Sequence, residues 1–198
     1  RILLPAGTGT VSFATSIVSY FTLFAQLGIP TYGIRACAKV RDKREELSKM
    51  VQELFIINLV MSLIAYVVFF AAIYYVPRFR QDKELFLVIG LTIFFNAIGV
   101  EWLYKALEQY TYITVRSIIF KFIAIVAMFL MVHEQSDYVI YGGISILASS
   151  ASNIFNFLHV HRYIDIKPTG HYNFKKHLNA IVIFFAMSCA TTIYTHLD

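Results

Sequence analysis

The sequence has few cysteines, and the two that it has, Cys37 and Cys189, lie far apart. They match no metal-ligand spacing, and so small a number predicts neither a disulfide framework nor a redox centre.

Charge is also scarce. Only 15% of the residues are charged while 58% are hydrophobic, and the mean hydropathy of +0.64 is too high for an ordinary soluble domain of this length. The net charge of +5 could indicate nucleic-acid binding. The basic residues alternate with apolar stretches instead of forming one patch, so we predict no nucleic-acid partner.

Recognisable catalytic motifs are missing. The stretch Gly7–Thr10 lacks the Lys-Ser/Thr of a phosphate-binding loop, and no Asp-x-Asp pair or Ser/His/Asp grouping stands out. His159 and His161 would face opposite sides of a helix, so they could share a metal only if the helix has ended. Together with His171 and His177 they are better interpreted as interfacial histidines in a basic loop. We therefore predict no enzymatic activity, no cofactor and no metal site.

Long apolar stretches are what the sequence has in abundance. About 20 helical residues cross a hydrocarbon core of roughly 30 Å, and six stretches reach that length. We therefore predict an all-α fold, a polytopic transmembrane helical bundle that forms one membrane domain over residues 1–198. The predicted spans cover residues 11–34, 54–77, 85–104, 113–132, 138–160 and 178–197.

The first apolar stretch, residues 2–34, is too long for one span. Pro5, Gly7 and Gly9 predict a loop at its start. Arg1 is not followed by the basic, apolar and small-residue series of a signal peptide. Because the chain also does not begin with Met, we expect a fragment of a longer protein.

Basic residues are distributed unevenly between the connectors. Thirteen of the seventeen Lys and Arg residues lie in the first, third and fifth connectors, and the fourth, around His133–Asp137, has none. Short loops rich in Lys and Arg stay in the cytoplasm. We therefore predict a multi-pass protein surrounded by membrane lipids, with loops 35–49, 105–116 and 161–177 in the cytoplasm and the first span running inward.

Polar residues inside the predicted spans are candidates for function, because they cost free energy unless they meet a partner or water. For the asparagines, hydrogen bonding between helices is the favoured interpretation. The intramembrane polar residues are Gln26, Glu53, Asn58, Asn96, Asn153 and Asn156.

Glu101 is the most ambiguous of the charged residues. It lies beside Trp102, and Arg35 and Arg116 are predicted at a similar depth in the membrane. These four residues are candidates for substrate binding or gating. A structural ion pair and a gating latch both stay open.

Several separated motifs occur in order along the chain: Tyr20-Phe21 with Gln26–Arg35, then Arg41-Asp42 with Glu45–Lys49, then Glu101-Trp102, Glu108 and Tyr112–Ser117, and last Ile193–Thr195 with Leu197-Asp198. Together they resemble the second helix, the loop after it, the connector of the fourth and fifth helices, and the seventh helix of bacterial polysaccharide flippases. These are the O-antigen and teichoic-acid type exporters of the multidrug/oligosaccharidyl-lipid/polysaccharide superfamily.

The resemblance implies helices two to seven, about one half of a two-bundle transporter in the bacterial cytoplasmic membrane. Such transporters flip undecaprenyl-pyrophosphate-linked oligosaccharide repeat units from the inner to the outer leaflet by alternating access. Lipid-linked oligosaccharide would be the main partner, with a polysaccharide polymerase and other assembly proteins as candidates. Arg35 or Arg116 would meet the pyrophosphate during loading. Alternatively, both would anchor helix ends, Arg35 through Glu101.

Two other functions compete with this one. A drug or cation exporter of the same superfamily would be expected to carry a carboxylate deep in its first bundle, and Glu53 and Glu101 lie near the predicted cytoplasmic face. A membrane-embedded glycosyltransferase or polysaccharide polymerase would need large outer loops or clustered carboxylates, and the outer loops are short. The exporter ranks second and the enzyme third.

Overall fold

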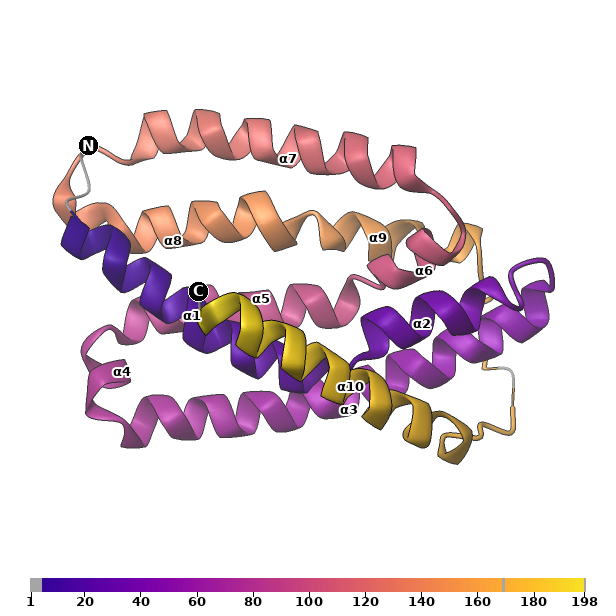
Figure 1. The fold of residues 1–198 in the computed structure, drawn as a ribbon. Coiled ribbons are helices and arrows are strands. Elements are labelled where there is room, and N and C mark those ends of the chain that lie inside the picture. Colours follow the sequence, from indigo (N-terminus) through magenta and orange to yellow (C-terminus); the bar gives the residue numbers. More distant parts are fainter. Residues whose placement is uncertain (1–4, 169, 198) are drawn as a thin grey trace.

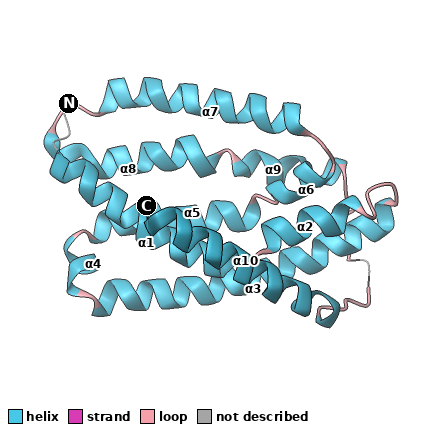
Figure 2. Ribbon diagram, viewed as in Figure 1, coloured by secondary structure: helices cyan, strands magenta, loops and turns pink. Residues whose placement is uncertain are grey.

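The computed structural model describes residues 5–168 and 170–197, which form helices and loops with no strand among them (Figures 1 and 2). The first apolar stretch, residues 2–34, begins before the described residues. The last of the motifs that carry the family resemblance ends at Asp198, which also lies outside them. The helices are α1 (Pro5–Gln26), α2 (Ile29–Ala38), α3 (Arg44–Tyr75), α4 (Pro77–Gln81), α5 (Lys83–Ile98), α6 (Glu101–Ala106), α7 (Tyr110–Met131), η1 (Gln135–Asp137), α8 (Tyr138–Ile146), η2 (Leu147–Ala151), α9 (Asn153–His159), η3 (Val160–Arg162) and α10 (Lys175–Leu197).

The first predicted span is two helices. The loop predicted from Pro5, Gly7 and Gly9 is wrong, because α1 begins at Pro5. Proline is tolerated in the first helical turn, where its missing N–H would have no partner. The helix ends at Gln26, and Leu27 and Gly28 both adopt positive φ, 45° and 72°, before α2 begins.

Helix α3 begins at Arg44, ten residues before the span predicted at 54–77. Its 32 residues correspond to a length of about 48 Å at 1.5 Å per residue. This exceeds a hydrocarbon core of about 30 Å. The first turns of α3 therefore extend beyond the core and carry its charged residues.

Two further predicted spans are interrupted. The span at 85–104 consists of α5, a break at Gly99 and Val100, and α6, and Val100 has a φ of 36°. The span at 138–160 consists of α8, the π-helical turn η2 and α9. In that turn the Ser149 hydroxyl donates to the Ser145 carbonyl at 2.9 Å, which satisfies a backbone acceptor where the helical pattern changes.

Among the residues that the structure describes, four helical segments are long and apolar enough to cross a membrane: 7–38, 44–75, 110–131 and 135–162. Helix α5 has 16 residues, fewer than the roughly 20 that a span needs, so the third crossing needs α6 as its continuation. Helix α10 has 23 residues. The protein is therefore an all-α, multi-pass membrane protein.

The first, third and fifth connectors meet at one end of the bundle, on the right in Figure 1. There Arg41 donates to Glu108 at 2.8 Å, and Arg44 donates to Asp165 at 3.0 Å. The Glu108 carboxylate raises the pKa of the Arg41 guanidinium by accepting its hydrogen bond. The second and fourth connectors lie at the opposite end. The three strongly basic connectors thus lie together at one end of the molecule, and the two weakly basic ones lie at the other.

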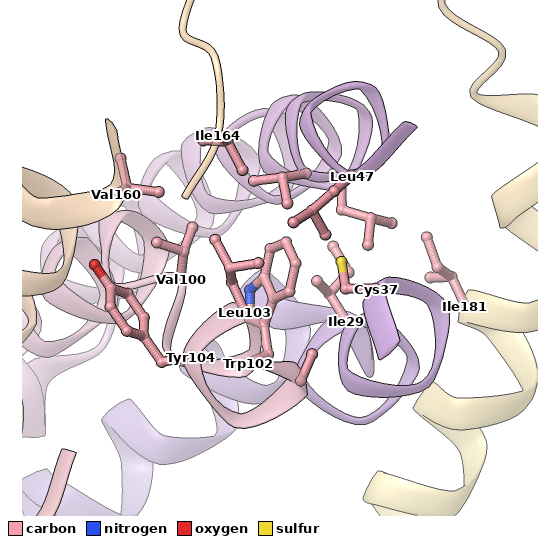
Figure 3. Packing of buried hydrophobic residues seen from close by; sticks show 13 residues of the cluster. Ile29, Cys37, Leu47, Val100, Trp102, Leu103, Tyr104, Val160, Ile164 and Ile181 are labelled. Atoms are coloured by element: carbon pink, nitrogen blue, oxygen red, sulfur yellow. The ribbon is translucent and has the colours of Figure 1, made fainter. Parts of the chain in front are cut away.

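Besides a small cluster of Ala124, Val132 and Ile144, two larger apolar cores hold the described part of the bundle together. One lies among α1, the second half of α3, α5 and α8, and contains Phe69 and Phe86. The other gathers α2, the start of α3, α6 and α10 around Trp102 (Figure 3). In this second core a Cβ at Gly33 would lie 2.6 Å from the Trp102 ring. Only glycine therefore lets α2 pack this closely on α6.

Candidate functional site

Two broken helices border the same cavity. The break between α1 and α2 contributes Gln26 and Pro30, and the break between α5 and α6 contributes Gly99 and Glu101. A residue such as Val100, which is β-branched and has a positive φ, is a backbone outlier. Strained backbone of this kind persists only where packing holds it, and it concentrates at functional sites.

The cavity has a volume of about 290 Å³, and much of its lining is polar. Of the residues that the sequence singled out, Gln26, Asn96, Glu101, Trp102 and Asn153 all border it. They come from helices that are far apart in the chain. In membrane transporters, irregular backbone at membrane depth occurs where it is buried in protein or lines a water-filled cavity.

Glu101 is paired with two cations beside this cavity. Its Oε1 lies 2.8 Å from Lys105 Nζ, and its Oε2 accepts from Arg116 Nη2 at 3.0 Å. The expected contact of Arg35 with Glu101 is wrong. Arg35 is exposed, and its guanidinium lies 5.0 Å from the centroid of the Phe184 ring. The break after Ile98 turns Glu101 toward the start of α7, so Arg116 reaches it instead.

Arg116 is only 7% exposed. Its Nη2 binds Glu101, whereas Nε and Nη1 have no partner among the described residues. It does not border the polar cavity but a second one, between α7 and α9. Arg35 borders a third cavity of about 380 Å³ with Tyr32 and Lys39. The two arginines proposed for pyrophosphate loading therefore do not share a site.

Asn58, Asn96 and Asn153 connect helices, as the favoured interpretation holds, whereas the Asn156 side chain bonds only within α9. Asn58 of α3 donates to the Ala97 carbonyl at 3.0 Å, near the end of α5. Asn153 of α9 donates to Asn96 Oδ1 at 3.1 Å, and Asn156 donates to Asn153 Oδ1 at 3.4 Å. A Cβ at Gly99 would lie 2.6 Å from the Asn153 side chain, so this glycine lets α9 reach the break.

Glu53 belongs to a second, closed network that the sequence did not indicate. The His177 ring places Nε2 2.7 Å from Glu53 Oε2 and Nδ1 2.9 Å from Tyr32 Oη. The Asn173 N–H donates to Glu53 Oε1 at 2.8 Å, and Lys176 Nζ lies 3.8 Å from Oε2. The side chains of Glu53 and His177 are 0% exposed. The network joins α2, α3 and α10.

The interpretation of His177 as an interfacial loop residue is therefore wrong. Helix α10 begins at Lys175, so His177 lies in its first turn on the same face as buried Ile181. Residues four apart share a helix face, and this spacing to an apolar residue was the available signal. His159 bonds the Phe155 carbonyl within α9, and His161 of η3 bonds the Leu158 carbonyl of α9. Among the described residues, no three His, Cys, Asp or Glu side chains gather in a group that could hold a metal.

Comparison with known proteins gives two matches. A family described as "Polysaccharide biosynthesis protein" matches residues 1–198. The chain is also similar to a protein of Escherichia coli (strain K12) named "Putative O-antigen transporter", with 21% identity over 154 residues. This match covers 78% of the chain but 37% of the relative, so the chain spans little more than a third of that protein. No solved structure matches the chain.

Proposed function

The chain belongs to the polysaccharide biosynthesis protein family, and from that premise we propose that it is part of a transporter for lipid-linked oligosaccharides. The transporter would flip undecaprenyl-pyrophosphate-linked repeat units from the inner to the outer leaflet of the bacterial cytoplasmic membrane. It would act without forming or breaking covalent bonds in its cargo. The name of the E. coli relative, "Putative O-antigen transporter", supports a transport function for this chain.

The observation that carries the proposal is the polar cavity between the two broken helices. Its amide side chains, Gln26, Asn96 and Asn153, supply both donors and acceptors. Sugar hydroxyl groups also donate and accept, so these amides suit an oligosaccharide. Asn153 and Asn96 already bond each other, so the Gln26 amide and the amide nitrogen of Asn96 are the groups that a polar cargo would bind in this apolar bundle.

The cations beside the cavity suit an anionic head group. Lys105 borders the cavity and is 41% exposed, so it can turn from Glu101 toward a passing phosphate. Charge-assisted bonds to phosphate are stronger than neutral ones. Glu101 would then act as a latch, holding Lys105 and Arg116 until the cargo's negative charge competes for them.

The basic end of the bundle supports the orientation. The first, third and fifth connectors share this end, and short basic loops stay in the cytoplasm. We infer that Glu101 and Lys105 lie toward the cytoplasmic side, where a lipid-linked oligosaccharide would load. A cation exporter is less well supported, because Glu53 and Glu101 are both already bound by basic side chains.

The test uses the complete protein that contains this chain, produced in cells that lack their own O-antigen transporter. The variant Gln26→Leu removes one polar group from the cavity at similar volume. We expect surface polysaccharide to fall about 2- to 10-fold, because a neutral hydrogen bond contributes about 0.5–1.5 kcal/mol. Gln135→Leu, the same change at an exposed position in η1 at the opposite end, is the control.

Two results would count against the proposal in different ways. If the unmodified protein restores no surface polysaccharide and clears no lipid-linked oligosaccharide from the inner leaflet, the transporter function is wrong. If it restores both, and Gln26→Leu and Gln135→Leu do so equally, the polar cavity is not the path of the cargo.

A further inference from the structure

A second cleft lies on the other side of Arg116, between the start of α7 and α9. It has a volume of about 600 Å³ and is separate from the polar cavity. Its lining divides into a polar end with Tyr112 and Arg116, and an apolar part with Ile119, Phe120 and Phe155. The cleft is therefore amphipathic along its length.

The polar end holds several donors without acceptors. Arg116 is buried, and its Nε and Nη1 have no partner among the described residues. The hydroxyl of Tyr112, buried as well, interacts with the Arg116 guanidinium, whose carbon lies 5.8 Å from the Tyr112 ring centroid, but it donates to no acceptor among the described residues. Buried polar groups are nearly always hydrogen-bonded in native proteins. Three unfilled donors at one place thus indicate a missing acceptor, and an oxyanion offers several acceptor oxygens to such a group.

The net charge around this end is positive and suits an anion. Arg116 and Lys105 carry two positive charges, and the Glu101 carboxylate between them carries one negative charge. Arg162 adds a further positive charge that acts on Tyr112. This excess of positive charge attracts a phosphodiester, which carries one negative charge.

The apolar part of the cleft opens on a surface that suits hydrocarbon. The rings of Phe120 and Phe155 pack at 5.5 Å across it. Ile119 is 51% exposed and its neighbours Ile118 and Phe122 are 60% and 66% exposed. Figure 1 shows α7 at the edge of the bundle. A chain of methylene groups can lie along this face while its head group reaches Arg116.

From these observations we propose that the cleft between α7 and α9 binds an anionic phospholipid of the bilayer through its phosphodiester. The phosphate oxygens accept from Arg116 and Tyr112, and an acyl chain lies against Ile119, Phe120 and Phe155. This site does not depend on what the protein transports. It would hold α7, which packs on the rest of the bundle through few buried residues, at a fixed depth in the membrane.

The experiment measures lipid binding by native mass spectrometry on the complete purified protein. The probes are dioleoyl phosphatidylglycerol, which carries the phosphodiester, dioleoylglycerol, which lacks it, and a polyprenyl phosphate. We expect phosphatidylglycerol to bind at least about tenfold more tightly than dioleoylglycerol, since hydrogen bonds to charged groups are the strong ones.

The variants locate the site. Arg116→Gln should weaken phosphatidylglycerol binding about tenfold or more, and Tyr112→Phe, which removes one hydroxyl, about threefold. Lys121→Gln removes an exposed cation from the same helix outside the cleft and should change binding less than about twofold. If Arg116→Gln does not fold, the comparison of phosphatidylglycerol binding between Tyr112→Phe and Lys121→Gln tests the site.

Three outcomes would overturn the proposal. Equal binding of phosphatidylglycerol and dioleoylglycerol would mean that the phosphate is not recognised. Equal binding by the unmodified protein and Tyr112→Phe, with Lys121→Gln as the weaker binder, would place the lipid elsewhere on α7. Polyprenyl phosphate binding tenfold more tightly than phosphatidylglycerol would make the carrier lipid the occupant instead of a bilayer lipid.

Discussion

Glu53 and Glu101 are two carboxylates near the same end of the bundle, and their surroundings differ. Glu53 is 0% exposed, and both of its oxygens accept from groups of α10 and the segment before it. Glu101 is 34% exposed, and its partner Arg116 keeps two donors unfilled beside a cleft. The difference teaches where binding is to be expected. A complete network leaves nothing for a ligand to satisfy, while an incomplete one does.

The closed network has a structural role that its members explain. Tyr32 belongs to α2, Glu53 to α3 and His177 to α10, and Tyr32 and Glu53 bond opposite nitrogens of the His177 ring. Because an ionised carboxylate only accepts, Nε2 of His177 carries the proton toward Glu53. These bonds fix the start of α10 against α2 and α3. The open network consists of Glu101, Lys105 and Arg116. It involves α6 and α7 and borders the polar cavity and the cleft between α7 and α9.

The largest expected effect comes from breaking the closed network. Glu53→Ala leaves His177, Lys176 and the Asn173 N–H without their acceptor, so the free energy of unfolding should fall by about 3–5 kcal/mol. Chemical unfolding in detergent micelles measures this. Glu45→Ala, in the exposed first turn of α3, should cost less than about 1 kcal/mol. Equal losses for the two variants would contradict a structural role for Glu53.

The anchoring of α10 can be tested from its other contact as well. Gly28 has a φ of 72°, and a Cβ there would lie 2.5 Å from the backbone nitrogen of Phe185. Gly28→Ala should therefore cost about 2–4 kcal/mol, from backbone strain and from displacement of α10. Gly9→Ala has open space around its Cβ and lies within α1, so it should stabilise by up to about 1 kcal/mol. A neutral Gly28→Ala would mean that α10 is not held closely against this turn.

The smallest effect is expected at the open network. Glu101→Gln keeps an acceptor oxygen for Arg116 but removes the charge, and Glu101 is partly exposed. We expect unfolding free energy to fall by about 1–2 kcal/mol. Glu108→Gln, which loses an exposed pair with Arg41, should cost less than about 1 kcal/mol. If Glu101→Gln costs as much as Glu53→Ala, the two networks are equally structural and the contrast between them fails.

Sequence reasoning found much of the candidate site without finding how it is connected. Gln26, Asn96, Glu101, Trp102 and Asn153 were singled out as polar or aromatic residues in apolar stretches, and all five border one cavity. Intramembrane polar residues are rare enough for each to be noticed alone. The sequence did not predict which of these side chains contact one another, because contacts between helices depend on where each helix ends.

The amino-acid sequence by itself determined the all-α fold, the membrane location and the gathering of basic connectors at one end. These depend on hydropathy and charge, which are properties of single segments. Only the tertiary structure decided the helix breaks, since Leu27 and Val100 have positive φ without any local residue preference for it. It also decided that Glu101 meets Arg116 and that Glu53 meets His177, 124 residues away. Such pairs form because packing brings the helices together, and a sequence pattern within one segment does not predict how that segment packs against another.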